Sequence, residues 1–202
     1  LVILLEFTDA AAARVRGADV DARYPHQLLG PSADQFGIAL LSRHPLEQTE
    51  TLNPPDIMST TRLRAMVRWQ GELIAVTAMH PMPPINAEYA VVRDADLAVE
   101  AKRLAGLTTG GAGGVPGILA GDLNDTPWST GAALMSPELR RASGLAPTWP
   151  NAGGRFSLLP LDHVFVTSHW SRRAAGLGPD LGSDHRPVVS ELLLRQSGDA
   201  GT

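Results

Sequence analysis

The sequence lacks several features that would assign a protein to a class at once. It contains no cysteine, which excludes disulfides, thiolate zinc sites and a cysteine nucleophile, and which leaves the compartment open. No apolar run reaches the roughly 18 residues that a membrane-spanning helix needs. The run Leu1–Leu5 meets Glu6 at once, so we recognise no signal peptide. Lysine is nearly absent, because Lys102 is the single lysine among 17 basic residues.

The length and composition are those of one globular domain. A chain of 202 residues fits a single domain, which we expect to cover residues 1–202. A hydrophobic content of 44% is enough to build a core and argues against intrinsic disorder. The 17 basic and 21 acidic residues give a net charge of −4. This charge disfavours nonspecific adhesion to nucleic acid, although it leaves room for a local basic groove.

The hydrophobic pattern predicts strands and helices mixed along the whole chain. Apolar or alternating runs predict strands near residues 1–5, 36–41, 60–70, 72–79, 115–120, 164–167 and 187–194. Helices are expected at residues 9–16, 86–107 and near 131–136. Asp9 and Asn86 are the expected N-caps of the first two helices. Small residues such as Ala98 and Ala105 recur at helical spacing in the second and predict its buried face. Mixed elements with an antiparallel hairpin predict a layered α/β sandwich.

Two groups of arginines allow two interpretations, phosphate contact or a solvated sheet edge. Arg62, Arg64 and Arg68 alternate with apolar residues along one predicted strand, and Arg172 and Arg173 are adjacent near the C-terminus. Either group has the charge to contact phosphates. A solvated sheet edge is the simpler interpretation, and we favour it.

Polar residues stand at the ends of the apolar strands, and this is the most informative feature of the sequence. Strand ends of a sheet share a rim, so these groups are expected to converge although they are far apart in sequence. A charge beside such apolar runs is costly unless it is paired or bound to a metal. Taken singly, each residue also fits a structural role, such as a turn, a solvated strand end or an ion pair. The residues are Glu6, His80, Asp122, Asn124, Asp162, His163, Asp184 and His185.

In their order along the chain, these segments resemble the motifs of the endonuclease/exonuclease/phosphatase family of deoxyribonuclease I-like hydrolases. The motifs are Leu4–Glu6, Met79–Pro81, Gly121–Asn124 (GDLN), Asp162–His163 and Ser183–Pro187 (SDHRP). The resemblance covers nearly the whole chain and implies a four-layer α/β sandwich, in which two packed mixed sheets are flanked by helices.

One segment of the family pattern is missing. The family begins with a strand that ends in an asparagine, upstream of the acidic strand, whereas the first asparagine here is Asn53. We therefore expect the sandwich to lack its first strand. Trp128 and Thr148–Pro150 are similar to the bacterial branch related to membrane-anchored glycopeptide-resistance proteins. That branch implies membrane contact only through an upstream anchor that this sequence does not contain.

The resemblance also implies a mechanism and a set of site residues. Water attacks the phosphorus directly, assisted by Mg²⁺, with Mn²⁺ or Ca²⁺ as alternatives. His185 is the expected base and Asp162 its orienting partner. Asn124 and His80 are expected to contact the phosphate, and Asp122 to orient the nucleophile or the metal. The expected metal ligands are Glu6, Asp184 and Asp122.

The substrate class stays open between related alternatives. The favoured function is a metal-dependent phosphoesterase acting on a phosphomonoester, a phosphodiester or a lipid pyrophosphate. An endonuclease acting on DNA or RNA is the first alternative, and the scattered aromatic residues do not favour it. A catalytically impaired relative that only binds phosphorylated ligands is the second. The sequence also spells GDxxD at Gly121–Asp125, but it lacks the other motifs of two-metal phosphoesterases. The oligomeric state is not predicted.

Overall fold

A computed structural model describes residues 1–54, 60–108, 114–135, 139–151 and 157–195. The strands are β1 (Val2–Leu5), β2 (His26–Gly30), β3 (Ile38–Ser42), β4 (Leu46–Leu52), β5 (Arg62–Trp69), β6 (Glu72–Met79), β7 (Gly117–Asp122), β8 (Arg140–Arg141), β9 (Asp162–Val166), β10 (Trp170–Leu177) and β11 (Val188–Leu194). The helices are α1 (Asp9–Val15), α2 (Ala18–Arg23), α3 (Ala87–Thr108) and α4 (Thr130–Leu134).

The strands form one large sheet and two small ones. The large sheet has the order β4-β5-β6-β7-β9-β8, and only β6 and β7 run parallel within it. A three-stranded sheet has the order β1-β3-β2, and β10 pairs with β11. The parallel β6–β7 pair needs a crossover, and α3 supplies it.

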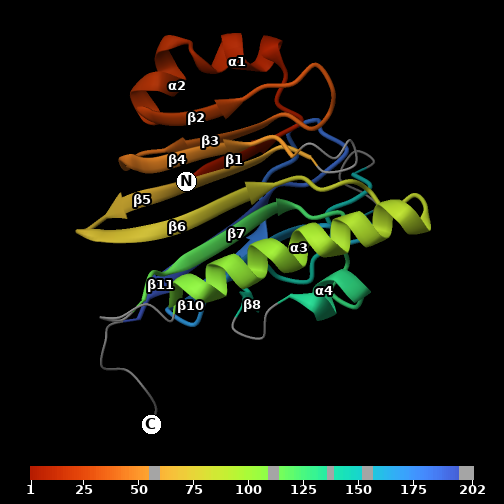
Figure 1. Cartoon of the computed structure of the whole chain (residues 1–202). Coiled ribbons are helices and arrows are strands. Elements are labelled where there is room, and N and C mark those ends of the chain that lie inside the picture. The colour runs from red at the N-terminus through yellow and green to blue at the C-terminus, as the bar shows by residue number, and fades with distance from the viewer. Residues whose placement is uncertain (55–59, 109–113, 136–138, 152–156, 196–202) are drawn as a thin grey trace.

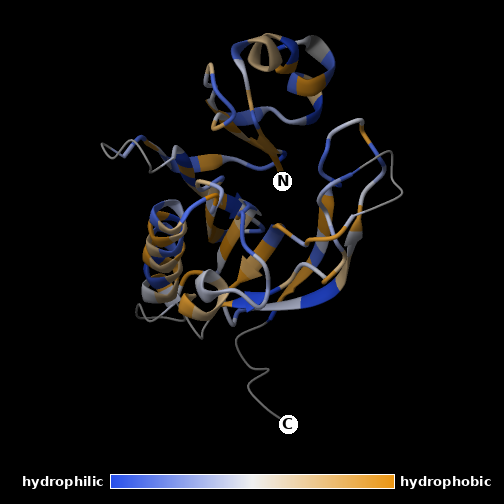
Figure 2. Cartoon of the chain, turned by 90° about the vertical axis from the view of Figure 1, so that its right-hand side faces the viewer, coloured by the Kyte–Doolittle hydropathy of each residue, from blue (hydrophilic) through white to orange (hydrophobic). Residues whose placement is uncertain are grey.

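The elements stack in the four layers that the resemblance implies. Helices α1 and α2 cover the outer face of the three-stranded sheet, and α3 and α4 cover the outer face of the large sheet (Figure 1). The turned view in Figure 2 shows α3 close to end-on beside the large sheet. Between the sheets lies the main core, which includes Ile38 and Leu40 of β3, Leu63 of β5 and Trp170 of β10. The α/β sandwich expected from the sequence is therefore confirmed.

The local predictions are confirmed where a strong signal existed. The hairpin of β5 and β6 turns through Gln70 and Gly71, which both have positive φ, and Asn86 caps α3 by accepting a hydrogen bond from the Tyr89 amide at 2.9 Å. The prediction that Asp9 is the N-cap of α1 is wrong. The cap is Thr8, whose hydroxyl accepts from the backbone of the first turn, and Asp9 is the first helical residue.

The predicted face of α3 is confirmed only in part, because Ala105 is buried as predicted whereas Ala98 is half-buried. The contact with the large sheet is made mainly by Leu97, Ala101 and Leu104, together with the charged Glu100. The larger side chains set the face because they fill the space above the sheet. None of the helices in the described part of the chain combines the length and the apolar character that crossing a membrane requires.

The arginines of β5 are neither a solvated edge nor a phosphate-binding surface. Arg62 is buried and Arg64 half-buried beneath α3, where both form ion pairs with Glu100. Only Arg68, paired with Glu47, lies in solvent. The alternation of β5 identified the residues that share a face, but the helix that covers this face carries the matching carboxylate.

Candidate active site

Three predicted site residues lie in one row across adjacent strands. Asp122 ends β7 and Asp162 opens β9, and the antiparallel register places them directly opposite each other. Residues in this relation have their Cβ atoms about 4.5–5.5 Å apart, so the two carboxyl groups are neighbours. His80 follows β6, whose parallel register with β7 aligns Ala78 with Ala120 and so brings His80 level with Asp122. The register of the large sheet therefore brings His80, Asp122 and Asp162 together.

Gly121 permits this close approach. A Cβ atom at residue 121 would lie 1.8 Å from the carbonyl oxygen of Met79, the residue before His80. The φ angle of Gly121 is 153°, a value that L side chains rarely adopt. Glycine before Asp122 is thus required for β6 and β7 to pack so that His80 and Asp122 meet.

A segment between the large sheet and the C-terminal hairpin brings in the second histidine. The Thr148 hydroxyl accepts hydrogen bonds from the amides of Leu161 and Asp162, and the Thr148 carbonyl accepts from Arg186 at 2.9 Å. Asn151 donates from its backbone to the Asp184 carbonyl at 2.6 Å and from its side chain to the Ser183 carbonyl. These bonds tie the residues around His185 to the start of β9.

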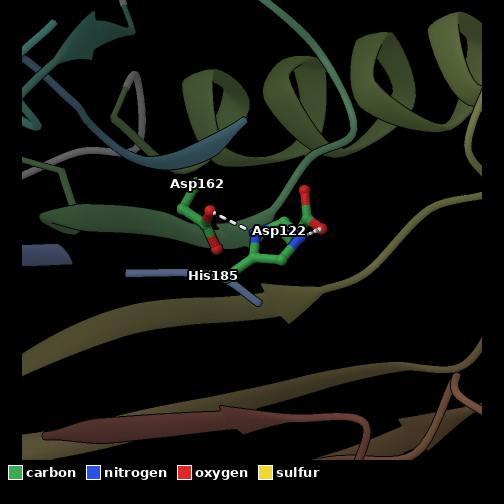
Figure 3. A group of neighbouring side chains, drawn as sticks. All are labelled: Asp122, Asp162 and His185. Atoms are coloured by element: carbon green, nitrogen blue, oxygen red, sulfur yellow. Dashed lines mark hydrogen bonds and ion pairs between the residues drawn. The ribbon is translucent and has the colours of Figure 1, made fainter. Parts of the chain in front are cut away.

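His185 lies between the two carboxylates (Figure 3). Its Nδ1 is 2.8 Å from Oδ2 of Asp162, and its Nε2 is 3.6 Å from Oδ2 of Asp122. Because a carboxylate only accepts, Nδ1 carries the proton of the shorter contact. Nε2 of His80 approaches the same Asp122 oxygen at 3.5 Å. Both histidines thus face one buried carboxylate.

The electrostatics of the group are strongly perturbed. Burial, reinforced by the charges of Asp162 and Glu6, raises the pKa of Asp122 to about 7. Burial opposes the charged form of His185, but the hydrogen bond to Asp162 and the charge of Asp122 raise its pKa to about 9. Burial lowers the pKa of His80. Such a set of opposed shifts in one cluster is typical of functional sites.

The other predicted residues lie around this cluster at different depths. Glu6 is exposed at the end of β1 and acts on Asp122 through its charge. Asp184 is exposed, and its charge acts on His185. The Asn124 amide group donates to the Pro81 carbonyl at 2.9 Å, while its backbone N–H donates to Oδ1 of Asp122. His163 is buried and bonded to Ser143 and the Asp125 carbonyl, away from the cluster of carboxylates.

The donor set fits a hard divalent cation. Among the described residues, Asp122, Asp162 and His185 offer ligand atoms that all lie within 4.8 Å of one another. Glu6 adds a further carboxylate whose charge, with burial and Asp162, holds the pKa of Asp122 above its ordinary value. Oxygen-rich sites of this kind suit Mg²⁺, Mn²⁺ or Ca²⁺, and Mg²⁺ needs only one or two carboxylates.

A cavity of about 550 Å³ opens beside His185. Most of its surface is apolar, and the polar residues that line it are Arg93, Asn124, Asp125, Thr126, Ser129 and His185. The Trp149 ring packs 6.5 Å from the His185 ring, centroid to centroid. The apolar wall residues are Pro83, Pro84, Ile85, Trp149, Leu159 and Leu161.

The apolar walls of this cavity, and the residues whose hydrogen bonds position the loops around His185, were not predicted from the sequence. Trp149 and Thr148 entered only as marks of a bacterial branch, and Asn151 was not singled out. The four-residue segment Thr148–Asn151 (TWPN) between apolar strands is the one signal in the sequence. It gives no indication that Thr148 and Asn151 bond to strand and loop backbones more than ten residues away.

Comparisons with known proteins agree with this fold. A search of curated proteins found no match to the sequence. An endonuclease/exonuclease/phosphatase from Beutenbergia cavernae is similar, with a TM-score of 0.69 and 22% identity over 91% of this chain, which spans 57% of that chain. D. rerio TDP2 complexed with single strand DNA product gives a TM-score of 0.75 and 16% identity, covering 95% of this chain and 85% of that one.

A third solved structure is an enzyme named for a lipid substrate. Sphingomyelinase C from Streptomyces griseocarneus gives a TM-score of 0.65 and 18% identity, covering 93% of this chain and 85% of that one. At these identities the likeness concerns the fold alone. The model of the Endonuclease/Exonuclease/phosphatase family matches residues 1–185, which is most of the chain. With the motif residues gathered at one rim of the matching fold, the chain belongs to the endonuclease/exonuclease/phosphatase family.

Proposed function

We propose that this chain is a metal-dependent phosphoesterase in which water attacks the phosphorus directly. Homologues in the family are hydrolases that act on phosphate esters. The observation that carries the proposal is the position of His185, which bonds to Asp162 through Nδ1 and presents Nε2 toward Asp122. This is the arrangement that a general base for a water nucleophile requires.

His185 and Asp162 act as a base and its positioning partner. Asp162 holds the proton on Nδ1, so Nε2 is the nitrogen that takes a proton from the attacking water. The same carboxylate then stabilises the imidazolium that results. The Thr148 hydroxyl fixes Asp162 through the backbone, so the acceptor does not move away as the charge develops.

Asn124 and His80 are the residues that we assign to contact with the phosphate. An amide nitrogen carries two protons, and Asn124 uses one of them on the Pro81 carbonyl, so the other is available for a nonbridging oxygen. His80, which follows the neighbouring strand β6, faces Asp122 and supports the phosphate or the leaving oxygen. Asp122, Glu6 and Asp184 are the proposed metal ligands, with Asp162 nearby. A divalent cation held there would polarise the phosphoryl group and, by its own charge, lower the pKa of His185.

The apolar cavity indicates the kind of substrate. Its walls, which include Trp149, Leu159 and Leu161, offer contact area to an apolar group attached near the scissile phosphate. A nucleic acid backbone would present sugars and charges to these walls instead. We therefore favour an ester of a small apolar or lipid alcohol, or a lipid pyrophosphate, over DNA or RNA.

Chelation of divalent cations tests the proposed reaction. With Mg²⁺, the purified chain is expected to hydrolyse an aryl phosphomonoester or diester, and excess EDTA is expected to abolish turnover until Mg²⁺ is restored. Plasmid nicking under the same conditions is expected to be weak. Undiminished hydrolysis in EDTA would contradict the metal-dependent mechanism, and efficient nicking at physiological salt would replace the phosphoesterase by a nuclease.

Truncating Trp149 tests the substrate pocket. In Trp149→Ala, we expect KM for a naphthyl phosphate to rise about 10-fold or more because the apolar contact beside His185 is lost, whereas KM for methyl phosphate changes little. Steady-state kinetics on the two esters measures the difference. Trp128→Ala is the matched control, since Trp128 is 69% exposed and does not line the cavity. An equal effect of Trp149→Ala on both esters would exclude a pocket for the apolar group.

A further inference from the structure

A second cleft, distinct from the candidate active site, gathers four arginines. It encloses about 730 Å³ between β8 and β10, and we call it the arginine cleft. Arg140 and Arg141 enter it from β8, and Arg172 and Arg173 enter it from β10. Figure 1 shows these strands at the lower side of the view, to the left of α4 and far from α1 and α2. In a chain with a net charge of −4, such a local excess of positive charge is notable.

The backbone places neighbouring arginines on one wall. Successive strand residues ordinarily point to opposite faces of a sheet. The register between β10 and β11 shifts between Arg172 and Ala174, and a bulge of this kind allows Arg172 and Arg173 to line the same cleft. The strand β8 is only two residues long and lies at the sheet edge. Its two adjacent arginines, Arg140 and Arg141, also line the same cleft.

The arginines differ in how their charge is balanced. Arg173 pairs with Glu191 at 2.8 Å, and Nη2 of Arg140 donates to the carbonyl oxygens of Ser168 and Trp170. Arg141 and Arg172 form no ion pair or side-chain hydrogen bond with the described residues. Burial and the charge of Arg172 together lower the pKa of Arg141, so the two guanidinium groups repel each other. The described residues thus leave three positive charges without a carboxylate partner.

The chemistry of the cleft points to a ligand rather than to an internal role. Guanidinium groups bind phosphate in a bidentate geometry, and a group of three exceeds the charge of one phosphate. The small residues Gly144, Ala174 and Ala175 line the same cleft and leave the guanidinium groups accessible. We propose that the arginine cleft is an anion-binding site for a ligand that carries two adjacent phosphate groups.

The cleft is separate from the site of hydrolysis. Arg140 and Arg141 pair with Val166 and Phe165, which lie four and three residues along β9 from Asp162. At about 3.4 Å per residue, this separation is roughly 10–14 Å along the strand. The proposed site therefore does not depend on the proposed phosphoesterase activity, and the two can be tested independently.

Calorimetric titration with inorganic pyrophosphate, in EDTA and at low ionic strength, tests the proposal. We expect the Arg141→Gln, Arg172→Gln double variant to bind pyrophosphate at least 30-fold more weakly than the native chain. The matched control is Arg16→Gln, Arg23→Gln, which removes two exposed charges from the α1–α2 region and is expected to bind as the native chain does. Hydrolysis of a small aryl phosphate by the cleft variant is expected to stay at the native rate.

Three results would overturn the site. They are no pyrophosphate binding by the native chain, equal losses in the cleft variant and the control, or loss of binding in His185→Ala, which would place pyrophosphate in the active site.

The single variant Arg172→Gln, at an exposed residue, provides the comparison if the double variant is unstable. Binding to phosphatidylcholine vesicles that contain 5% phosphatidylinositol 4,5-bisphosphate, whose headgroup carries two neighbouring phosphates, separates the sources of the ligand. Retention that depends on Arg141 and Arg172 supports a lipid headgroup, whereas pyrophosphate binding without retention supports a free ligand. Binding of single-stranded DNA through these arginines, without pyrophosphate binding, would replace the proposal by a nucleic acid surface.

Discussion

His185→Ala is expected to lower kcat for Mg²⁺-dependent phosphoester hydrolysis by about 10²–10⁴-fold, the usual contribution of a positioned general base. The imidazole is held by the 2.8 Å contact to Asp162, and no other histidine reaches Asp162 at this distance among the described residues. His80 does not replace it, because burial lowers the pKa of His80 and its Nε2 faces Asp122. Initial rates at saturating substrate measure the effect.

The expected loss must be separated from unfolding. His185 is only half-buried, so its truncation leaves the core intact, and we expect thermal unfolding of His185→Ala to follow that of the native chain. His26→Ala, on β2 in the opposite sheet, is a matched control with native kcat. Asp162→Asn is expected to lower kcat as well, because an amide does not stabilise the imidazolium. A folded His185→Ala protein with kcat within twofold of the native value would remove His185 as the base.

The convergence of the candidate site residues could be predicted from the sequence because they follow or precede apolar strands. Asp122 and Asp162 are separated by 40 positions, yet both stand at the same rim and meet through strand register. The links made by Thr148 and Asn151 were not readable, since their partners are backbone groups of distant loops and strands. Hydrophobic periodicity carries no information about such contacts. The cavity walls were missed for the same reason.

The interior strands were predictable, and of the edge strands only β1 and β11, which are rich in apolar residues, were predicted. The strands with apolar runs, such as β3 and β6, were predicted, because burial on both faces leaves a continuous hydrophobic pattern. The missed strands β2, β4, β8 and β10 all lie at the edge of a sheet. Edge strands expose one side to solvent, and β10 is exposed over most of its length. Their residues therefore read as loop or polar surface.

Burial of charge is the other property that the sequence pattern concealed, and it leads to a large expected effect on stability. Glu100 is fully buried on the face of α3 that covers β5, and it contacts the guanidinium groups of Arg62, Arg64 and Arg103. Glu100→Gln is expected to lower the free energy of unfolding by about 3–5 kcal/mol, because it leaves the arginines without their common partner. Urea denaturation at pH 7 measures the change.

A matched substitution separates burial from charge. Glu50 also pairs with Arg64, at 3.0 Å, but its side chain is 50% exposed. Exposed pairs contribute about 0–1 kcal/mol, so Glu50→Gln is expected to change the free energy of unfolding by no more than that. Equal destabilisation by the two variants would show that the cluster beneath α3 does not depend on Glu100.

The same cluster predicts how stability depends on pH. Burial alone raises the pKa of Glu100, but Arg64 and Arg103 outweigh burial and hold this pKa below its ordinary value. A carboxyl group with a lowered pKa in the folded state binds fewer protons there than in the unfolded chain, so its contribution is complete above the unfolded pKa of about 4.3. The contribution is lost as the pH falls through the folded pKa. The difference in unfolding free energy between the native chain and Glu100→Gln should therefore be constant above about pH 5 and shrink in more acidic solution. A difference that grows on acidification would mean that Glu100 is neutral in the folded protein, and the arginines beneath α3 would then require another counter-charge.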